Sequence, residues 1–100
     1  MPTWGIVVGD IPVKSINLSD QKAVISELLA ENAFVWDKRA EITQVRWLQY
    51  STNPPVNKLT TSIVIEFTTL EAANAAVDQG TIWKAVVYQT TCYNHKAHIK

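Results

Sequence analysis

The chain has one cysteine, three glycines and no long hydrophobic run, and each shortage excludes a class of protein. With Cys92 alone, no internal disulfide can form, which is typical of proteins in a reducing setting inside the cell, in the cytoplasm or nucleus. No segment approaches the roughly 20 apolar residues that cross a bilayer, so we expect no membrane partner. The N-terminus lacks a basic stretch followed by an apolar run, so the sequence predicts no secretory signal.

Side chains that could carry catalysis are also scarce. The two histidines, His95 and His98, lie near the C-terminus without a rigid setting for acid–base work, and the acidic residues are scattered singly. The glycines do not have the spacing of a phosphate-binding loop. The sequence therefore predicts a protein that is not an enzyme and uses no cofactor.

Neither sign of charge is in excess. Nine basic and nine acidic side chains balance, and the sequence pI is near 6.7. Nonspecific binding of nucleic acid depends on concentrated Lys and Arg, so the balance argues against it. A local basic patch, or recognition of unpaired bases, stays open.

Hydrophobic residues are abundant and make up 47% of the 100 residues, which predicts one packed domain. We place this domain at residues 1–90 and assign residues 91–100 to a polar C-terminal tail. Within that tail Cys92, His95 and His98 are weak candidates for zinc ligands. A structural zinc site normally has four ligands, and a fourth is not evident here, so we predict no metal site.

The strongest strand in the sequence is residues 58–67, KLTTSIVIEF. Its β-branched residues alternate with a period of two, so Ile63, Ile65 and Phe67 share a face that we expect to be buried. The opposite face then carries Ser62 and Val64 together with a glutamate.

Three further strands are predicted at 4–8, 42–50 and 82–90, the first of them stopped by Gly9-Asp10. In the strand at 42–50 we choose Val45 and Trp47 as the buried side chains. The opposite register, which would bury Ile42, Leu48 and Tyr50, is nearly as good, and a slip by one residue would exchange the two faces.

A first helix is predicted from residue 19 or 20 to about Asn32, with Asn17 or Ser19 as its cap and Asp20 in its first turn. Asn32 would end it in a left-handed conformation. The apolar stripe of this helix, which we expect in the core, consists of Val24, Ile25, Leu28 and Leu29.

A second helix is predicted at 70–79, where Thr68 and Glu71 have the spacing of a capping box and Gly80 follows the last turn. Between the first helix and the next strand, Phe34 and Trp36 are expected to pack beneath the sheet.

The element order is strand, helix, strand, strand, helix, strand. Two split βαβ units of this length predict an α+β, ferredoxin-like βαββαβ fold, in which a four-stranded antiparallel sheet has both helices on one face. Right-handed crossovers then place the first and third strands in the centre.

This order resembles the RNA recognition motif, whose sheet stacks bases on aromatic rings. The matching positions here are Val7, Ser62 and Val64, and none carries a ring. A closer resemblance is to the gag-like proteins of fungal non-LTR retrotransposons, in which an RNA-recognition-motif-like domain precedes CCHC zinc knuckles. The stretches that carry it are VVGDIPV (7–13), EN (31–32), VRWL (45–48), SIVIEF (62–67), EAANAAVDQG (71–80) and CYNHKAH (92–98).

The resemblance implies a retrotransposon-derived protein that binds RNA or assembles particles, with its zinc knuckles degenerate or truncated. We therefore predict binding of single-stranded RNA. The residues expected to contact RNA are Val7, Arg46, Lys58, Ser62, Val64, Lys84 and Tyr88. The alternative is a module for protein–protein interaction or homo-oligomerisation, with an apolar patch of Val7, Val64 and Leu48 on the sheet. Arg46 could equally be a solvated strand residue, and Tyr88 could close the edge of the core.

Overall fold

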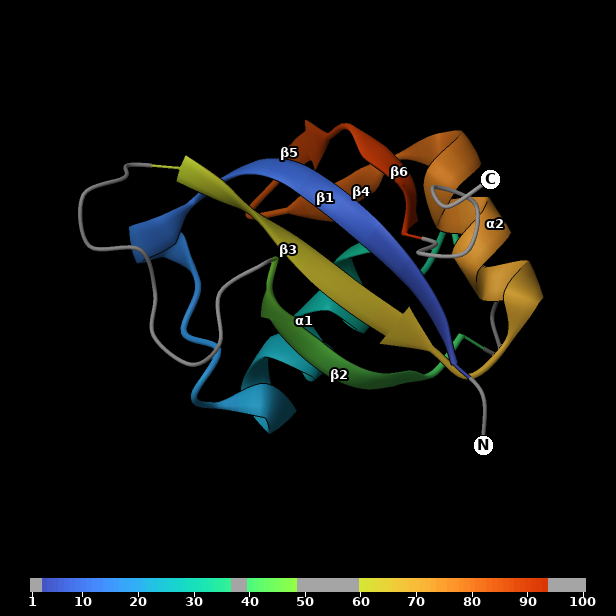
Figure 1. The fold of residues 1–100 in the computed structure, drawn as a ribbon, viewed down its shortest axis with the longest axis horizontal. Helices are drawn as coiled ribbons and strands as arrows, with labels where there is room; N and C mark the ends of the chain where they lie inside the picture. The colour runs from blue at the N-terminus through green and yellow to red at the C-terminus, as the bar shows by residue number, and fades with distance from the viewer. Residues whose placement is uncertain (1–2, 37–39, 49–59, 94–100) are drawn as a thin grey trace.

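A four-stranded antiparallel sheet forms the centre of the molecule, and its strand order is β2-β3-β1-β6 (Figure 1). The structure is a computed structural model that describes residues 3–36, 40–48 and 60–93. The sheet consists of β1 (Trp4–Pro12), β2 (Ile42–Trp47), β3 (Thr60–Phe67) and β6 (Thr90–Tyr93). The helices are the short 3-10 turn η1 (Val13–Ser15), α1 (Gln21–Glu31) and α2 (Leu70–Gln79). The prediction that the first and third strands are central is confirmed.

Helices α1 and α2 pack against the same face of the sheet. Ile63, Ile65 and Phe67 of β3 are at most 1% exposed and share one core cluster with Leu28 of α1 and Ala76 of α2. Three alanines of α2, Ala72, Ala73 and Ala76, are at most 5% exposed and belong to this core. The alternation in β3 therefore predicted its buried face correctly.

The register chosen for β2 is also confirmed, since Val45 and Trp47 are buried. Ile42 is buried as well, because an irregularity in the pairing with β3 lies between it and Gln44 and shifts the alternation. Trp36 packs edge-on against Phe67, with 5.1 Å between the ring centres. Phe34 does not join it: the prediction of a buried Phe34 is wrong, because the turn after α1 leaves this side chain 100% exposed.

Strand β1 does not stop at Gly9-Asp10. Its register with β3 shifts between Val8 and Ile11, where Asp10 has φ 61°, and pairing resumes as far as Pro12. This bulge keeps Ile11 buried although it is three residues beyond Val8. The expected end of the strand is thus a bulge inside it.

Neither helix N-cap is the residue predicted, and each follows directly after a predicted one, Ser19 or Thr68. Asp20 is the N-cap of α1 and accepts a hydrogen bond from the Ala23 amide at 3.2 Å. Thr69, not Thr68, caps α2 by accepting from the amide of the residue three positions on. Asn32 does end α1, but with φ −105° and not in a left-handed conformation. Gly80, with φ 85°, ends α2 as predicted.

The predicted last strand at 82–90 is instead three short strands. β4 (Thr81–Trp83) and β5 (Val86–Tyr88) form a separate two-stranded hairpin, and β6 supplies the fourth strand of the main sheet. Lys84 and Ala85 make the two-residue turn, with φ 52° and 65°. The carboxylate of Glu31 accepts their amides at 2.8 and 2.9 Å.

β6 runs into the segment that the sequence assigned to the tail, because Thr91, Cys92 and Tyr93 pair with β1. In the described part of the chain no helix is long and apolar enough to cross a membrane.

Candidate functional site

The face of the sheet opposite the helices is the candidate site, and its side chains form two rows across the strands. In one row, Gly5 of β1 is the register partner of both Glu66 on β3 and Tyr93 on β6. In the next, Val64 is the register partner of Val7 and of Arg46. The rows place an aromatic ring, a carboxylate and a guanidinium on one surface.

Gly5 lets the ring of Tyr93 lie against the backbone of β1. A Cβ at this position would come within 3.2 Å of Cδ2 of Tyr93, which is closer than an ordinary van der Waals contact. The missing side chain at Gly5 therefore makes room for the ring on the sheet.

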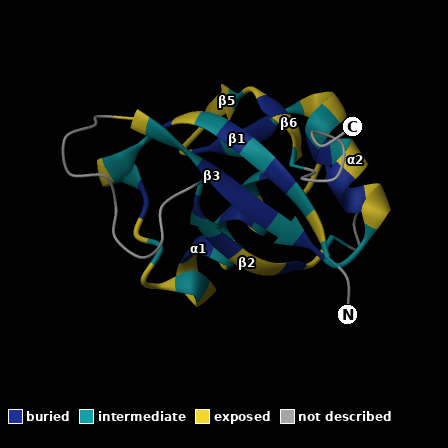
Figure 2. Cartoon of the chain, in the orientation of Figure 1, coloured by how far each residue is buried: buried dark blue, intermediate teal, exposed yellow. Residues whose placement is uncertain are grey.

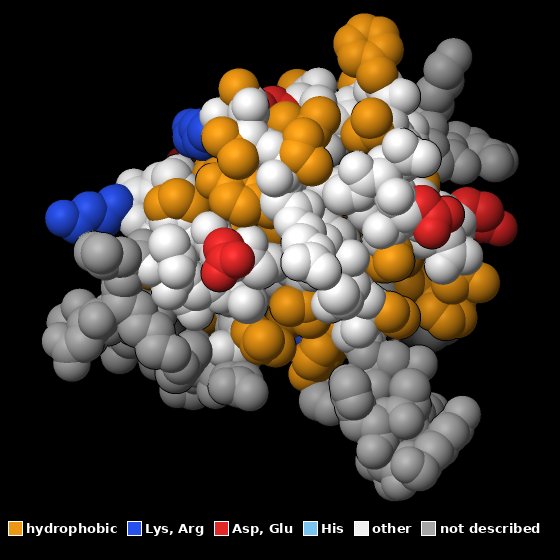
Figure 3. Space-filling model, turned by 90° about the horizontal axis from the view of Figure 1, so that it is seen from above, with side chains coloured by type: hydrophobic (Ala, Val, Ile, Leu, Met, Phe, Trp, Pro, Cys, Tyr) orange, Lys and Arg blue, Asp and Glu red, His pale blue; other side chains and the backbone are white. Residues whose placement is uncertain are grey.

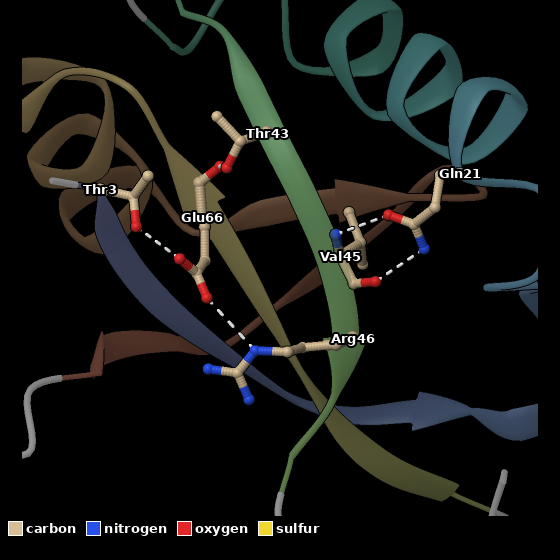
Figure 4. Close-up of polar contacts among 6 residues, drawn as sticks. All are labelled: Thr3, Gln21, Thr43, Val45, Arg46 and Glu66. Carbon is tan, nitrogen blue, oxygen red and sulfur yellow. Dashed lines mark hydrogen bonds and ion pairs between the residues drawn. The ribbon is translucent and has the colours of Figure 1, made fainter. Parts of the chain in front are cut away.

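Arg46 extends from β2 across the sheet toward this ring. Its Nε donates to Oε2 of Glu66 at 3.2 Å (Figure 4). Its guanidinium carbon lies 5.3 Å from the centre of the Tyr93 ring. The hydroxyl of Thr3 donates to Oε1 of the same glutamate. A cation this close to an aromatic ring is attracted to it. We call Thr3, Gly5, Arg46, Glu66 and Tyr93 the Arg46 cluster.

The cluster is accessible to solvent. The side chain of Arg46 is 35% exposed and that of Glu66 is 22% exposed. An exposed ion pair of this kind contributes only about 0–1 kcal/mol, so a ligand can replace it at little cost. Among the described residues, the four terminal N–H groups of Arg46 have no hydrogen-bond partner. They are free to donate to a phosphate or to a base.

Val64 does not contribute to the outer surface as predicted, because it is fully buried. Its register partners Val7 and Arg46 stand on either side of it, and the Arg46 side chain runs over β3 toward β6. Figure 2 accordingly shows the middle of β3 in dark blue. Val7 and Ser62 are half-buried on the same face.

Two other predicted contacts lie away from this face. Lys84 is at the hairpin turn, where its Nζ pairs with Glu27 of α1 at 2.9 Å and lies 5.0 Å from the centre of the Trp83 ring. Tyr88 of β5 pairs with Thr81 and packs against the core. This agrees with the alternative interpretation, in which Tyr88 closes the edge of the core. Lys58 lies outside the described residues. The structure therefore gathers Val7, Arg46 and Ser62, and separates Lys84 and Tyr88 from them.

Sequence reasoning missed Tyr93, and it placed Glu66 on the outer face without giving it a role. Tyr93 was assigned to a tail, although TTCY is a run of residues that favour strands, and Thr91 and Tyr93 alternate onto one face. That run could have revealed β6. The role of Gly5 depends on pairing between distant strands and has no local signal.

The weak zinc candidates are not gathered by the structure. Cys92 is exposed on β6, and His95 and His98 lie outside the described residues. Within residues 3–36, 40–48 and 60–93, no three Cys, His, Asp or Glu side chains are placed to hold a metal ion.

Charge is distributed unevenly along the chain. The described residues contain four basic side chains against eight acidic ones, a net charge of −4. The remaining five basic residues and one acidic residue fall in 37–39, 49–59 and 94–100. Arg46 is thus the one Lys or Arg on the described outer face.

Comparison of the chain with protein-family models, curated proteins and solved structures gives no match.

Proposed function

We propose that this chain is a non-catalytic module with a ferredoxin-like arrangement, similar to an RNA recognition motif, that binds single-stranded RNA on the outer face of its sheet. The order β2-β3-β1-β6 with both helices on one face supports the arrangement. The resemblance to gag-like proteins supports RNA as the ligand and an origin in a retrotransposon. The β4–β5 hairpin is an addition to that arrangement.

The observation that carries the proposal is the position of Tyr93 and Arg46. The ring of Tyr93 lies beside the backbone of Gly5, and the guanidinium of Arg46 lies over that ring. Unpaired bases stack on aromatic side chains and on guanidinium planes, so this pair is a stacking platform. It takes the place of the rings that are missing at Val7, Ser62 and Val64.

The described outer face carries one cationic side chain, and the described residues together have a net charge of −4. Binding therefore depends on stacking and hydrogen bonds more than on phosphate contacts. For a single strand, the logarithm of affinity falls with the logarithm of salt by about 0.7 for each phosphate neutralised. If Arg46 makes one such contact, its removal lowers this slope by about 0.7.

Fluorescence anisotropy with a labelled single-stranded RNA, at low and at physiological salt, tests the proposal. Replacing Tyr93 by Ala should weaken binding roughly tenfold, since a stacked base is worth about 1–3 kcal/mol, whereas Tyr93→Phe should retain binding. Lys84→Ala is the matched control for Arg46→Ala, because Lys84 pairs with α1 and not with the outer face. The proposal fails if the protein binds no RNA even at low salt.

A second candidate function is self-association, which the hairpin favours. Val86 and Val87 of β5 are 49% and 64% exposed. The edge of the molecule around β5 and β6 shows many hydrophobic and few charged side chains (Figure 3). Sedimentation of the free protein tests this candidate, with Val87→Thr as an isosteric polar variant. A monomer at high concentration argues against self-association.

A further inference from the structure

We infer that Arg46 and Glu66 together read the edge of a guanine base in the RNA. This inference rests on the proposed function and specifies its ligand. It starts from the hydrogen-bonding capacity that the pair leaves unused on the outer face.

Glu66 retains acceptor positions. A carboxylate has about four lone-pair positions on its two oxygens. Thr3 uses one on Oε1 and Arg46 uses one on Oε2, so each oxygen can accept a further hydrogen bond. With 22% of its side chain exposed, Glu66 can be reached from solvent.

Arg46 supplies donors directly beside these acceptors. Only its Nε is engaged with Glu66, and among the described residues the terminal nitrogens have no hydrogen-bond partner. A ligand at this place therefore meets donors on one side and a carboxylate with two available oxygens on the other. A base that lies beside the pair, in the plane of the guanidinium, would present its edge to both side chains.

Guanine is the base that complements this arrangement. Its Watson–Crick edge presents the O6 acceptor next to two donors, N1–H and the N2 amino group, which can bond both oxygens of one carboxylate while Arg46 donates to O6. Adenine and cytosine each present one amino donor next to ring nitrogen acceptors. Uracil presents one N–H between two carbonyl oxygens, which a carboxylate repels.

The test uses the full chain and a set of short single-stranded RNAs that differ only in their central base: guanine, adenine, cytosine, uracil or hypoxanthine. Anisotropy titrations should show guanine bound roughly fivefold or more tightly than the other three standard bases, the lower limit for a good bidentate contact. Hypoxanthine lacks the amino group on C2, so it should lie between guanine and uracil.

Glu66→Gln should bring the affinities for the four standard bases together without abolishing binding. Glu71→Gln on α2 removes the same charge from an exposed position and should leave the guanine preference unchanged. Equal affinity of the natural chain for all four bases, or a full preference in Glu66→Gln, overturns the guanine inference but leaves RNA binding intact. Failure to bind any of the RNAs overturns both. The hypoxanthine measurement needs no variant, so it decides the question even if Glu66→Gln does not fold.

Discussion

The side-chain amide of Gln21 pairs with the backbone of Val45 as a neighbouring strand would. Its Nε2 donates to the Val45 carbonyl at 2.7 Å, and its Oε1 accepts from the Val45 amide at 2.9 Å (Figure 4). Val45 lies on β2, an edge of the main sheet. Because unpaired edges invite pairing with other chains, one amide here both holds α1 to the sheet and blocks the edge.

The other end of α1 uses the same device on a different sheet. The carboxamide of Asn32 accepts from the Ile82 amide at 2.8 Å and donates to the Ile82 carbonyl at 2.9 Å. Ile82 lies on β4. The first residue of α1 and its C-cap therefore fix the helix between the main sheet and the hairpin.

Replacing Gln21 by Ala should lower the free energy of unfolding by about 1–3 kcal/mol, because two backbone groups of Val45 lose their partners. Urea unfolding followed by circular dichroism measures this change. Lys22→Ala is the matched control, since Lys22 is an exposed neighbour in the same helical turn. An equal loss in both variants would show that α1, and not the edge contact, is responsible.

Replacing Asn32 by Ala should be more destabilising, by about 2–4 kcal/mol, because Asn32 is fully buried and bonds the Ile82 backbone twice and the Leu28 carbonyl once. Thermal and urea unfolding measure the effect. Asn17→Ala serves as control, because Asn17 is exposed in the segment before the start of α1. A loss below about 1 kcal/mol would mean that water replaces the carboxamide easily.

The hairpin turn is open to stabilisation. Lys84 and Ala85 both have positive φ, a conformation that costs a residue with a side chain roughly 1 kcal/mol and glycine almost nothing. Ala85→Gly should therefore raise the free energy of unfolding by about 0.5–1 kcal/mol. Ala75→Gly, inside α2, should lower it by a similar amount because glycine is a poor helix former. If Ala85→Gly also lowers the stability, the turn is not strained.

The hairpin turn also shows what local sequence patterns cannot predict. The alternation in β3 predicted its buried residues because period two is a local property, and the order of elements predicted the central strands. A Lys-Ala turn has no local signal, since it is held by the carboxylate of Glu31, which lies far away in the sequence. Read without that contact, IWKAVV is one continuous strand.

The candidate site was only partly predictable for the same reason. Arg46 could be assigned to the outer face once the register of β2 was chosen. The enclosure of Val64 depends on where Arg46 extends, and the position of Tyr93 depends on pairing between β1 and β6. Both are relations between strands that no single stretch of sequence encodes.

The two glycines of β1 provide the sharpest test of this site. Gly5→Ala should leave the fold intact but displace the ring of Tyr93, because the new Cβ would lie 3.2 Å from Cδ2 of that ring. We expect RNA affinity to fall toward that of Tyr93→Ala, by roughly tenfold if the stacked base is lost. Gly9→Ala is matched in strand and substitution, but its Cβ would meet only Ser62 Oγ, at 3.9 Å. Anisotropy should therefore detect no change for Gly9→Ala. An equal loss of affinity in both variants would show that any added side chain on β1 disturbs binding. Unchanged affinity in both variants would remove Tyr93 from the binding surface.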